Sequence, residues 1–350
     1  MLVLSLQYLR GLAAFMVLIE HIGLKSEQQS ANILSFWHVG GAGVDLFFLI
    51  SGFIMCHTTA HKHQTAGASV QFIWRRIMRI IPLYWIVTCL ALMVYWVVPS
   101  QVNSGSGADL IASYFLLPSE QVYLVANGWT LRFEFLFYFV FMLGLWLSRR
   151  MGNALVITLL ITMVGFGVWK PQQGIWGEFL THTLLLEFAL GMLLYHSFER
   201  LKQLPMILLM GIIGLGVGAL LAVNQGVQSN LRVIDFGLPM LLIMASVLGL
   251  EEILQEHPIE LLKILGDTSY AMYLIHPFAL ACGAMVLGKL GLSHVLGGWF
   301  FVSVLLVASL MAGYCLYEWV EKPIAKCLQK RPDIKSIKPN DLEQPLRGSI

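Results

Sequence analysis

Residues 205–223 of this 350-residue chain read PMILLMGIIGLGVGALLAV, a stretch without a single charged side chain. An α-helix rises 1.5 Å per residue, so a helix of this length covers about 28 Å, close to the roughly 30 Å hydrocarbon core of a bilayer. The stretch therefore predicts a transmembrane helix. Its glycines are small enough to let neighbouring helices approach closely in lipid; they are Gly211, Gly214, Gly216 and Gly218.

The composition of the whole chain also favours a membrane protein. Hydrophobic residues make up 57% of the chain and charged residues only 12%, whereas a soluble domain averages about 25% charged residues. Such a shortage of polar surface is tolerable where lipid covers much of the outside, and apolar runs of similar length recur along the chain. The net charge of +2 comes without a basic stripe, so we expect no nucleic-acid partner.

We predict an all-α fold, a polytopic transmembrane bundle of about ten helices. Residues 1–325 form one transmembrane domain in this prediction, and residues 326–350, which contain three prolines, form a cytoplasmic and largely disordered tail. The predicted segments are 5–23, 37–56, 80–98, 127–148, 152–169, 179–198, 205–223, 233–250, 269–288 and 295–320.

The distribution of Lys and Arg among the connections predicts the orientation of the bundle. Sixteen of these 22 residues lie in the tail and in connections after even-numbered segments, and four lie in connections after odd-numbered segments. Positively charged connections stay on the cytoplasmic side of the membrane. We therefore expect both termini in the cytoplasm.

Charged side chains inside a membrane span are costly and often mark a functional site. The first segment holds both Arg10 and His21. Eleven residues at 100° each return to within about 20° of the same helix face, and the two side chains lie about 16 Å apart along the axis. With the N-terminus inside, Arg10 lies near the cytoplasmic mouth and His21 in the outer third.

Other polar residues divide between these two levels. Counting from the predicted segment ends places Asp45 and Glu134 at about the depth of His21, and it places His276 in the inner half of the ninth segment. Three arginines crowd the predicted cytoplasmic start of the third segment, level with Arg10. They are Arg75, Arg76 and Arg79.

This layout suits a long phosphorylated carrier such as coenzyme A. Guanidinium groups bind phosphate, and a neutral imidazole can deprotonate a hydroxyl as general base while a carboxylate fixes its tautomer. With its phosphates held by the inner arginines, the carrier would bring its thioester to the level of His21. His276 either shapes the donor channel or makes a structural hydrogen bond.

Six blocks of sequence resemble, in order, the acyltransferase-3 family of bacterial membrane O-acyltransferases, and most closely its exopolysaccharide acetyltransferase branch. Together they spread over residues 6–323, nearly the whole chain. The blocks are LQYLRGLAA (6–14) with His21, GAGVDLFFLISGFIM (41–55), RRIMRIIPLYW (75–85), WTLRFEFLFY (129–138), LGDTSY (265–270) with YLIHP (273–277), and EKP (321–323).

The resemblance implies a ten-helix bundle in the bacterial cytoplasmic (inner) membrane. It implies an acyl-CoA donor, acetyl-CoA first, and an acceptor hydroxyl on a cell-surface glycan, an exopolysaccharide or its lipid-linked oligosaccharide precursor. It also implies that Arg10 and His21 are the essential pair, with His21 as base, and that Arg76 and Arg79 belong to the acyl-CoA site. Our catalytic candidates are His21, Arg10, Glu134 and Asp45, and our donor-binding candidates are Arg75, Arg76, Arg79 and His276.

Simpler roles exist for several of these residues. The arginines of the third segment also fit a topology determinant, Glu134 can pair with Arg132, and Asp45 can form a hydrogen bond between helices. Three histidines in the second connection have a spacing that resembles metal ligands, but no carboxylate is near them in sequence, so we expect a solvated loop and no metal. They are His57, His61 and His63.

Two classes of function compete for this pattern. One is an O-acyltransferase, and the other is a polysaccharide-related transporter or flippase whose intramembrane charges gate a path. Transporters often have repeated halves and helices broken at the middle of the membrane, whereas this sequence has no detectable repeat and its charges are polarised. A structural subunit of an export complex would leave the Arg10 and His21 pattern unexplained. We therefore favour the acyltransferase.

Overall fold

The computed structural model of the chain describes residues 3–28, 33–98, 107–229, 231–290 and 297–329, and none of these residues lies in a β-strand. The helices are α1 (Leu4–Gln28), α2 (Ala42–Thr59), α3 (Ala68–Val97), α4 (Leu110–Phe115), α5 (Gly128–Gly144), α6 (Arg149–Trp169), α7 (Ile175–Leu180), α8 (Leu185–Leu201), α9 (Met206–Asn224), η3 (Val233–Gly237), α10 (Leu238–Gly249), α11 (Glu251–Glu256), α12 (Glu260–Lys289), α14 (Gly298–Leu316), η4 (Tyr317–Glu321) and α15 (Lys322–Gln329).

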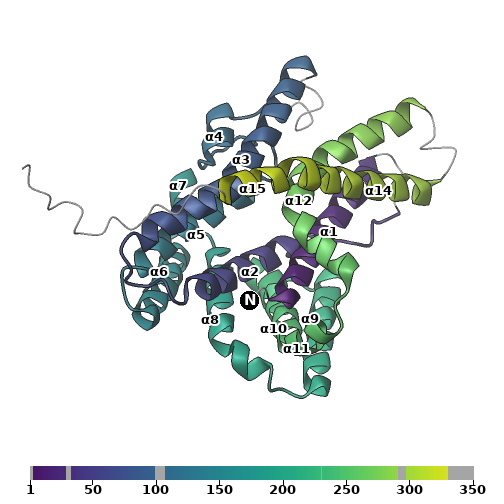
Figure 1. The fold of residues 1–350 in the computed structure, drawn as a ribbon. Helices are drawn as coiled ribbons and strands as arrows, with labels where there is room; N and C mark the ends of the chain where they lie inside the picture. Colours follow the sequence, from purple (N-terminus) through teal and green to yellow (C-terminus); the bar gives the residue numbers. More distant parts are fainter. Residues whose placement is uncertain (1–2, 29–32, 99–106, 230, 291–296, 330–350) are drawn as a thin grey trace, which may run out of the picture.

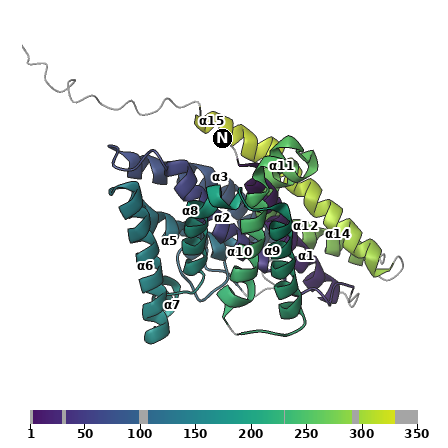
Figure 2. The same cartoon turned by 90° about the horizontal axis from the view of Figure 1, so that it is seen from below.

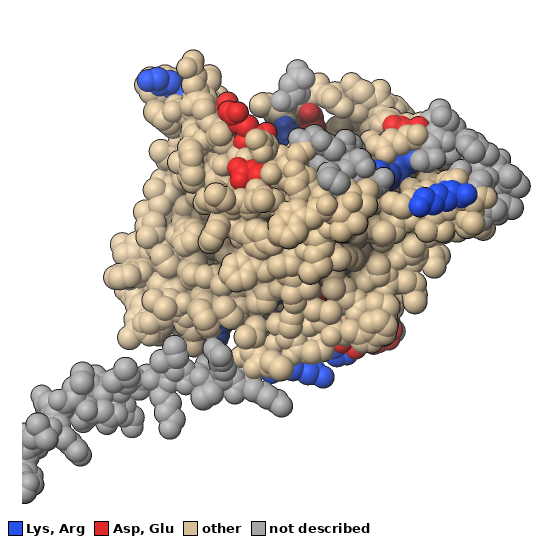
Figure 3. Space-filling view, turned by 90° about the horizontal axis from the view of Figure 1, so that it is seen from above, with Lys and Arg blue, Asp and Glu red and all other residues tan. Residues whose placement is uncertain are grey.

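Seven helical stretches are long and apolar enough to cross a membrane. They are Ala42–Thr59, Ala68–Val97, Arg149–Trp169, Ile175–Leu201, Met206–Asn224, Glu260–Lys289 and Gly298–Leu328. The three other predicted segments coincide with α1, α5 and the joined η3 and α10. Figure 3 shows a broad band without charged side chains between charged residues at two opposite edges of the visible face. The all-helical prediction is therefore confirmed for the described residues, with seven candidate spans.

Two helices begin well before their predicted starts. The helix α3 starts at Ala68 and not at residue 80, and α12 starts at Glu260 and not at residue 269. The first turns of α3 are amphipathic: Phe72 is buried while Gln71 and Trp74 are exposed. A hydropathy window misses such turns because polar residues interrupt the apolar run. The arginines of this region consequently lie within α3 and not before it.

At the C-terminal end, α15 continues through Gln329. Four residues of the predicted tail 326–350 are therefore helical, and the rest of the predicted tail lies outside the described residues.

The helix α1 lies inside the bundle, in contact with α2, α12 and α14 (Figures 1 and 2). Leu9, Leu18 and Ile22 are fully buried on it, and its polar residues meet protein partners. Glu20, for example, accepts a hydrogen bond of 2.9 Å from the backbone N–H of Gly40. Because partners from neighbouring helices replace water, α1 can carry charged residues that a lipid-facing helix would not tolerate.

Glycines let α2 and α8 pack backbone to backbone. A Cβ atom on Gly52 would lie 2.1 Å from the carbonyl oxygen of Phe188, and a Cβ on Gly191 would lie 2.0 Å from that of Leu49. Both distances are far below van der Waals contact. These reciprocal contacts fix the spacing of the two helices.

The expectation for the glycines of α9 is wrong at three of four positions. Only Gly216 packs closely, since a Cβ there would lie 2.9 Å from the carbonyl oxygen of Pro239. A Cβ at the other three would meet nothing within 4 Å. Composition alone did not show which face of α9 meets a neighbour.

The packing of α1 against α12 gives a first testable prediction. A Cβ on Gly266 would lie 2.2 Å from the carbonyl oxygen of Gln7, so we expect Gly266→Ala to push the helices apart. The expected loss is about 1–3 kcal/mol of unfolding free energy, measured by SDS titration in mixed micelles. The control is Gly218→Ala, because a Cβ there meets open space. Equal stability of the two variants would contradict this packing.

Candidate active site

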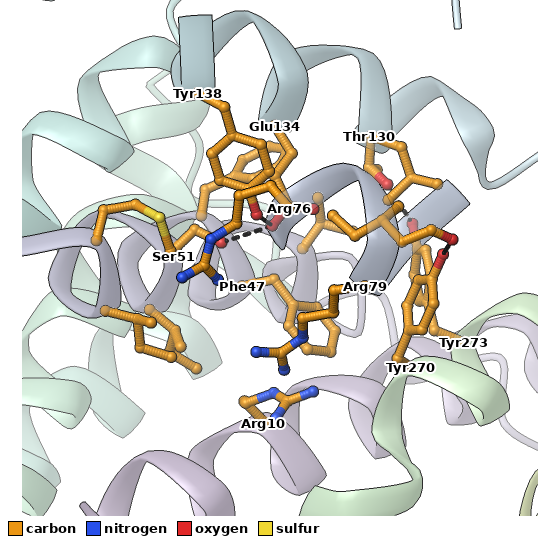
Figure 4. A pocket seen from close by; sticks show the side chains of 17 residues that line it. Arg10, Phe47, Ser51, Arg76, Arg79, Thr130, Glu134, Tyr138, Tyr270 and Tyr273 are labelled. Carbon is orange, nitrogen blue, oxygen red and sulfur yellow. Dashed lines mark hydrogen bonds between the residues drawn. The ribbon is translucent and has the colours of Figure 1, made fainter. Parts of the chain in front are cut away.

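A cavity of about 100 Å³ lies between α1, α2, α3, α5 and α12. Three guanidinium groups face it, those of Arg10 from α1 and of Arg76 and Arg79 from α3 (Figure 4). Phenylalanine and tyrosine rings line much of the remaining wall. The cavity is thus a strongly cationic space inside an otherwise apolar bundle.

One arginine of the cavity, Arg76, retains a hydrogen-bond donor that none of the described residues uses. The Nε atom of Arg76 is buried without a hydrogen-bond partner among the described residues, while its Nη2 lies 3.4 Å from the Thr58 hydroxyl. The Arg10 Nη1 donates to the side chain of Gln7 at 3.0 Å. A buried donor without a partner is costly, so an acceptor group entering this cavity would be stabilised.

Glu134 is the one acidic residue among the described side chains that line the cavity. Its carboxylate accepts hydrogen bonds from Ser51, at 3.0 Å, and from Tyr138. The sequence placed Glu134 at the level of His21, but it lies with the arginines. The early start of α3 places Arg76 and Arg79 two to three turns into that helix, level with Glu134 at the cavity. Glu134 therefore balances part of their charge.

The two histidines lie next to each other, behind the cavity wall. The Nδ1 atom of His21 is 3.3 Å from Nε2 of His276, and their ring centroids are 5.0 Å apart. Neither is among the described side chains lining the cavity, but Tyr273 lines it, and the Tyr273 ring centroid is 6.1 Å from that of His276. His276 thus lies with His21, and not with the arginines at the donor end where we had placed it.

The comparison with known proteins follows this geometry. A family model described as an acyltransferase domain matches residues 3–318. This chain belongs to the acyltransferase-3 family.

Two curated relatives are similar to this acyltransferase-3 chain over most of its length. The exopolysaccharide production protein ExoZ of Rhizobium meliloti (strain 1021) is 30% identical over 306 residues, which cover 82% of this chain and 90% of ExoZ. The acyltransferase MdmB of Streptomyces mycarofaciens is 26% identical over 377 residues, covering 93% of this chain and 92% of MdmB. No solved structure matches. With its seven apolar helical spans, the chain is a multi-pass membrane acyltransferase.

Asp45 of this acyltransferase-3 chain bonds across helices, from α2 to the start of η3, which is the simpler role considered for it. It is fully buried and pairs with Arg232, at 2.7 Å to Nη2 and 3.0 Å to Nε. The contacts of the His21 ring among the described residues are the Val17 carbonyl, at 2.9 Å, and His276, neither of them a carboxylate. Asp45 therefore does not orient His21.

Sequence reasoning missed both partners of Asp45. Glu187 is fully buried, and no described residue donates a hydrogen bond to either of its carboxylate oxygens. It lies beside Asp45 and Arg232. Its position inside the predicted segment 179–198 was a usable signal, because a charge within a span is rarely without a role. Arg232 immediately precedes the predicted segment 233–250 and looked like a loop residue.

Arg75, the remaining candidate, does not line the cavity that Arg10, Arg76 and Arg79 face. It lines a second cavity of the acyltransferase-3 chain together with Lys62 and Arg76. Arg76 is therefore shared by the two spaces.

Proposed function

We propose that this acyltransferase moves an acyl group, acetyl first, from cytoplasmic acyl-CoA to a hydroxyl of an exopolysaccharide or its lipid-linked precursor. The site would lie in the bacterial inner membrane with both termini of the chain in the cytoplasm. One observation carries the proposal: Arg10, Arg76 and Arg79 face a single cavity, and Arg10 shares its helix with His21. The name of the relative ExoZ supports a polysaccharide acceptor.

The cavity suits the phosphates of coenzyme A. Guanidinium groups pair with phosphate oxygens through parallel hydrogen bonds, and the Nε of Arg76, which has no partner among the described residues, can donate one. Glu134 reduces the repulsion among the arginines before the donor arrives. We assign Arg10, Arg76 and Arg79 to donor binding on this ground.

The pairing of the histidines supports His21 as the general base. The Nδ1 of His276 lies 3.0 Å from the Met272 carbonyl, and a carbonyl only accepts, so this nitrogen carries the proton when the ring is neutral. Its Nε2 then offers a lone pair to Nδ1 of His21, which must be the N–H. That N–H also faces the Val17 carbonyl. The Nε2 of His21 is left unprotonated and able to accept a proton.

The proposed reaction uses this nitrogen directly. His21 Nε2 takes the proton of the acceptor hydroxyl while the hydroxyl oxygen bonds to the thioester carbonyl carbon. The carbon–sulfur bond then breaks, and coenzyme A leaves as a thiol after taking up the proton from His21. During the step, His276 Nε2 and the Val17 carbonyl stabilise the charged His21 ring, because both are acceptors. His276 thereby acts as a positioning residue.

Labelled acetyl-CoA supplied to purified protein in proteoliposomes, with polysaccharide or lipid-linked oligosaccharide as acceptor, tests the proposal. We expect label in the glycan, and we expect Arg79→Ala to raise the KM for acetyl-CoA about tenfold or more, because a lost charge-assisted hydrogen bond costs about 1.5–3 kcal/mol. Arg150→Ala is the control, since Arg150 is an exposed residue of α6 outside the cavity.

An unchanged KM in Arg79→Ala would remove Arg79 from the donor site. Movement of glycan across the vesicle membrane without any labelled product would favour the transporter or flippase instead.

A further inference from the structure

A second cavity, of about 220 Å³, lies where the end of α2 meets the first turns of α3. Its polar wall comes from three cationic residues and from hydroxyl and amide side chains. These polar lining residues are Thr58, Thr59, Lys62, Gln71, Arg75 and Arg76. The proposed function does not use this cavity.

The charge of this cavity is one-sided. Lys62, Arg75 and Arg76 line it, and no acidic side chain does so among the described residues. Lys62 forms no ion pair with any described residue. Burial lowers the pKa of Lys62, and the charges of Arg75 and Arg76 lower it further. Three cations that repel one another around a cavity are stabilised when an anion enters it.

Arg76 connects the two cavities. It lines the first cavity, described above as the candidate active site, beside Arg10 and Arg79, and it lines the second cavity beside Lys62. A ligand bound across Arg76 would therefore present phosphate to cationic groups on both sides. Such a ligand needs two separate phosphate groups. Coenzyme A has them, because its ribose carries a diphosphate on the 5′-oxygen and a single phosphate on the 3′-oxygen.

We propose that the second cavity, around Lys62 and Arg75, binds the 3′-phosphate of the donor, while the first cavity, around Arg10 and Arg79, holds the diphosphate. This assignment rests on the proposed function for the identity of the donor. Lys62 offers a compact ammonium group and Arg75 a forked guanidinium group, and both groups commonly bind phosphate in proteins. The headgroup of an anionic phospholipid offers the same phosphate chemistry, so the test separates the two sources.

Coenzyme A and dephospho-coenzyme A differ only in the 3′-phosphate, and their binding requires no turnover. We expect the purified protein in phosphatidylcholine nanodiscs to bind coenzyme A about tenfold more tightly than dephospho-coenzyme A, the range of a lost charge-assisted hydrogen bond. Lys62→Gln should reduce this ratio to near one by weakening coenzyme A binding alone. Lys62→Arg should keep the preference, and Arg150→Gln, the exposed control on α6, should match the wild type.

Each alternative result has its own reading. Equal binding of both compounds by the wild type would overturn the assignment while leaving the donor site in place. A preference that survives in Lys62→Gln would also overturn it. Loss of coenzyme A binding only when phosphatidylglycerol is added would assign the cavity to a lipid headgroup. No binding of either compound would instead refute acyl-CoA as the donor, which is a failure of the proposed function.

Discussion

Replacing His21 with alanine is expected to lower the turnover of acyl transfer by about 10²–10⁴-fold, the usual contribution of a general base. The expected loss falls on kcat, because His21 contacts His276 and does not line the arginine cavity that we assign to the donor. The KM for acyl-CoA therefore stays near its original value. Transfer of labelled acetyl groups to the glycan acceptor, measured over a range of acetyl-CoA concentrations, checks both parameters.

The control for His21→Ala is His257→Ala, since His257 is exposed at the end of α11. His276→Leu should lower kcat as well, because it removes the acceptor that faces Nδ1 of His21. His276→Gln keeps an amide oxygen there and should recover part of the rate. Full activity in His21→Ala would refute the role of His21 as general base. Full activity in His276→Leu, with His21→Ala inactive, would refute only the positioning role.

The second large effect is expected at Arg232. Asp45 has 0% side-chain exposure beside Arg232, which is 32% exposed, so Arg232→Met leaves a buried carboxylate without its cation. Either the charge stays buried, or the carboxyl takes up a proton at neutral pH, which costs about 4 kcal/mol for an ordinary pKa near 4. We expect the unfolding free energy to fall by about 3–5 kcal/mol, measured by SDS titration in mixed micelles.

Two matched variants separate the charge effect from other losses. Arg200→Met removes an exposed arginine near the end of α8 and should leave stability unchanged. Glu187→Gln should cost little, because neither carboxylate oxygen of Glu187 accepts a hydrogen bond from the described residues and the amide therefore replaces no contact. Wild-type stability in Arg232→Met would show that the Asp45 pair contributes nothing to the fold.

The sequence predicted well those helices that are apolar along their whole length. The segment 205–223 became α9 at Met206–Asn224, because an unbroken apolar run leaves hydropathy no ambiguity about its ends. The predicted helix start was wrong where apolar and charged residues are mixed. The first turns of α3 alternate apolar and cationic residues, and a start at residue 80 instead of Ala68 displaced the arginines.

The candidate site was harder to predict because its contacts join distant parts of the chain. The spacing of Arg10 and His21 is local, and it placed both correctly on one helix. Asp45 and Arg232 are 187 residues apart, and His21 and His276 are 255 apart. Depth along a helix axis says nothing about which neighbour a side chain faces, and that depends on packing between helices.

The reciprocal glycine contacts at Gly52 and Gly191 have a consequence for how a bulky acceptor reaches the site. With backbone atoms already touching, α2 and α8 can neither slide along each other nor separate by a small step without losing the whole contact. We therefore expect the bulky acceptor of the proposed reaction to reach the site between other helices, and not between α2 and α8.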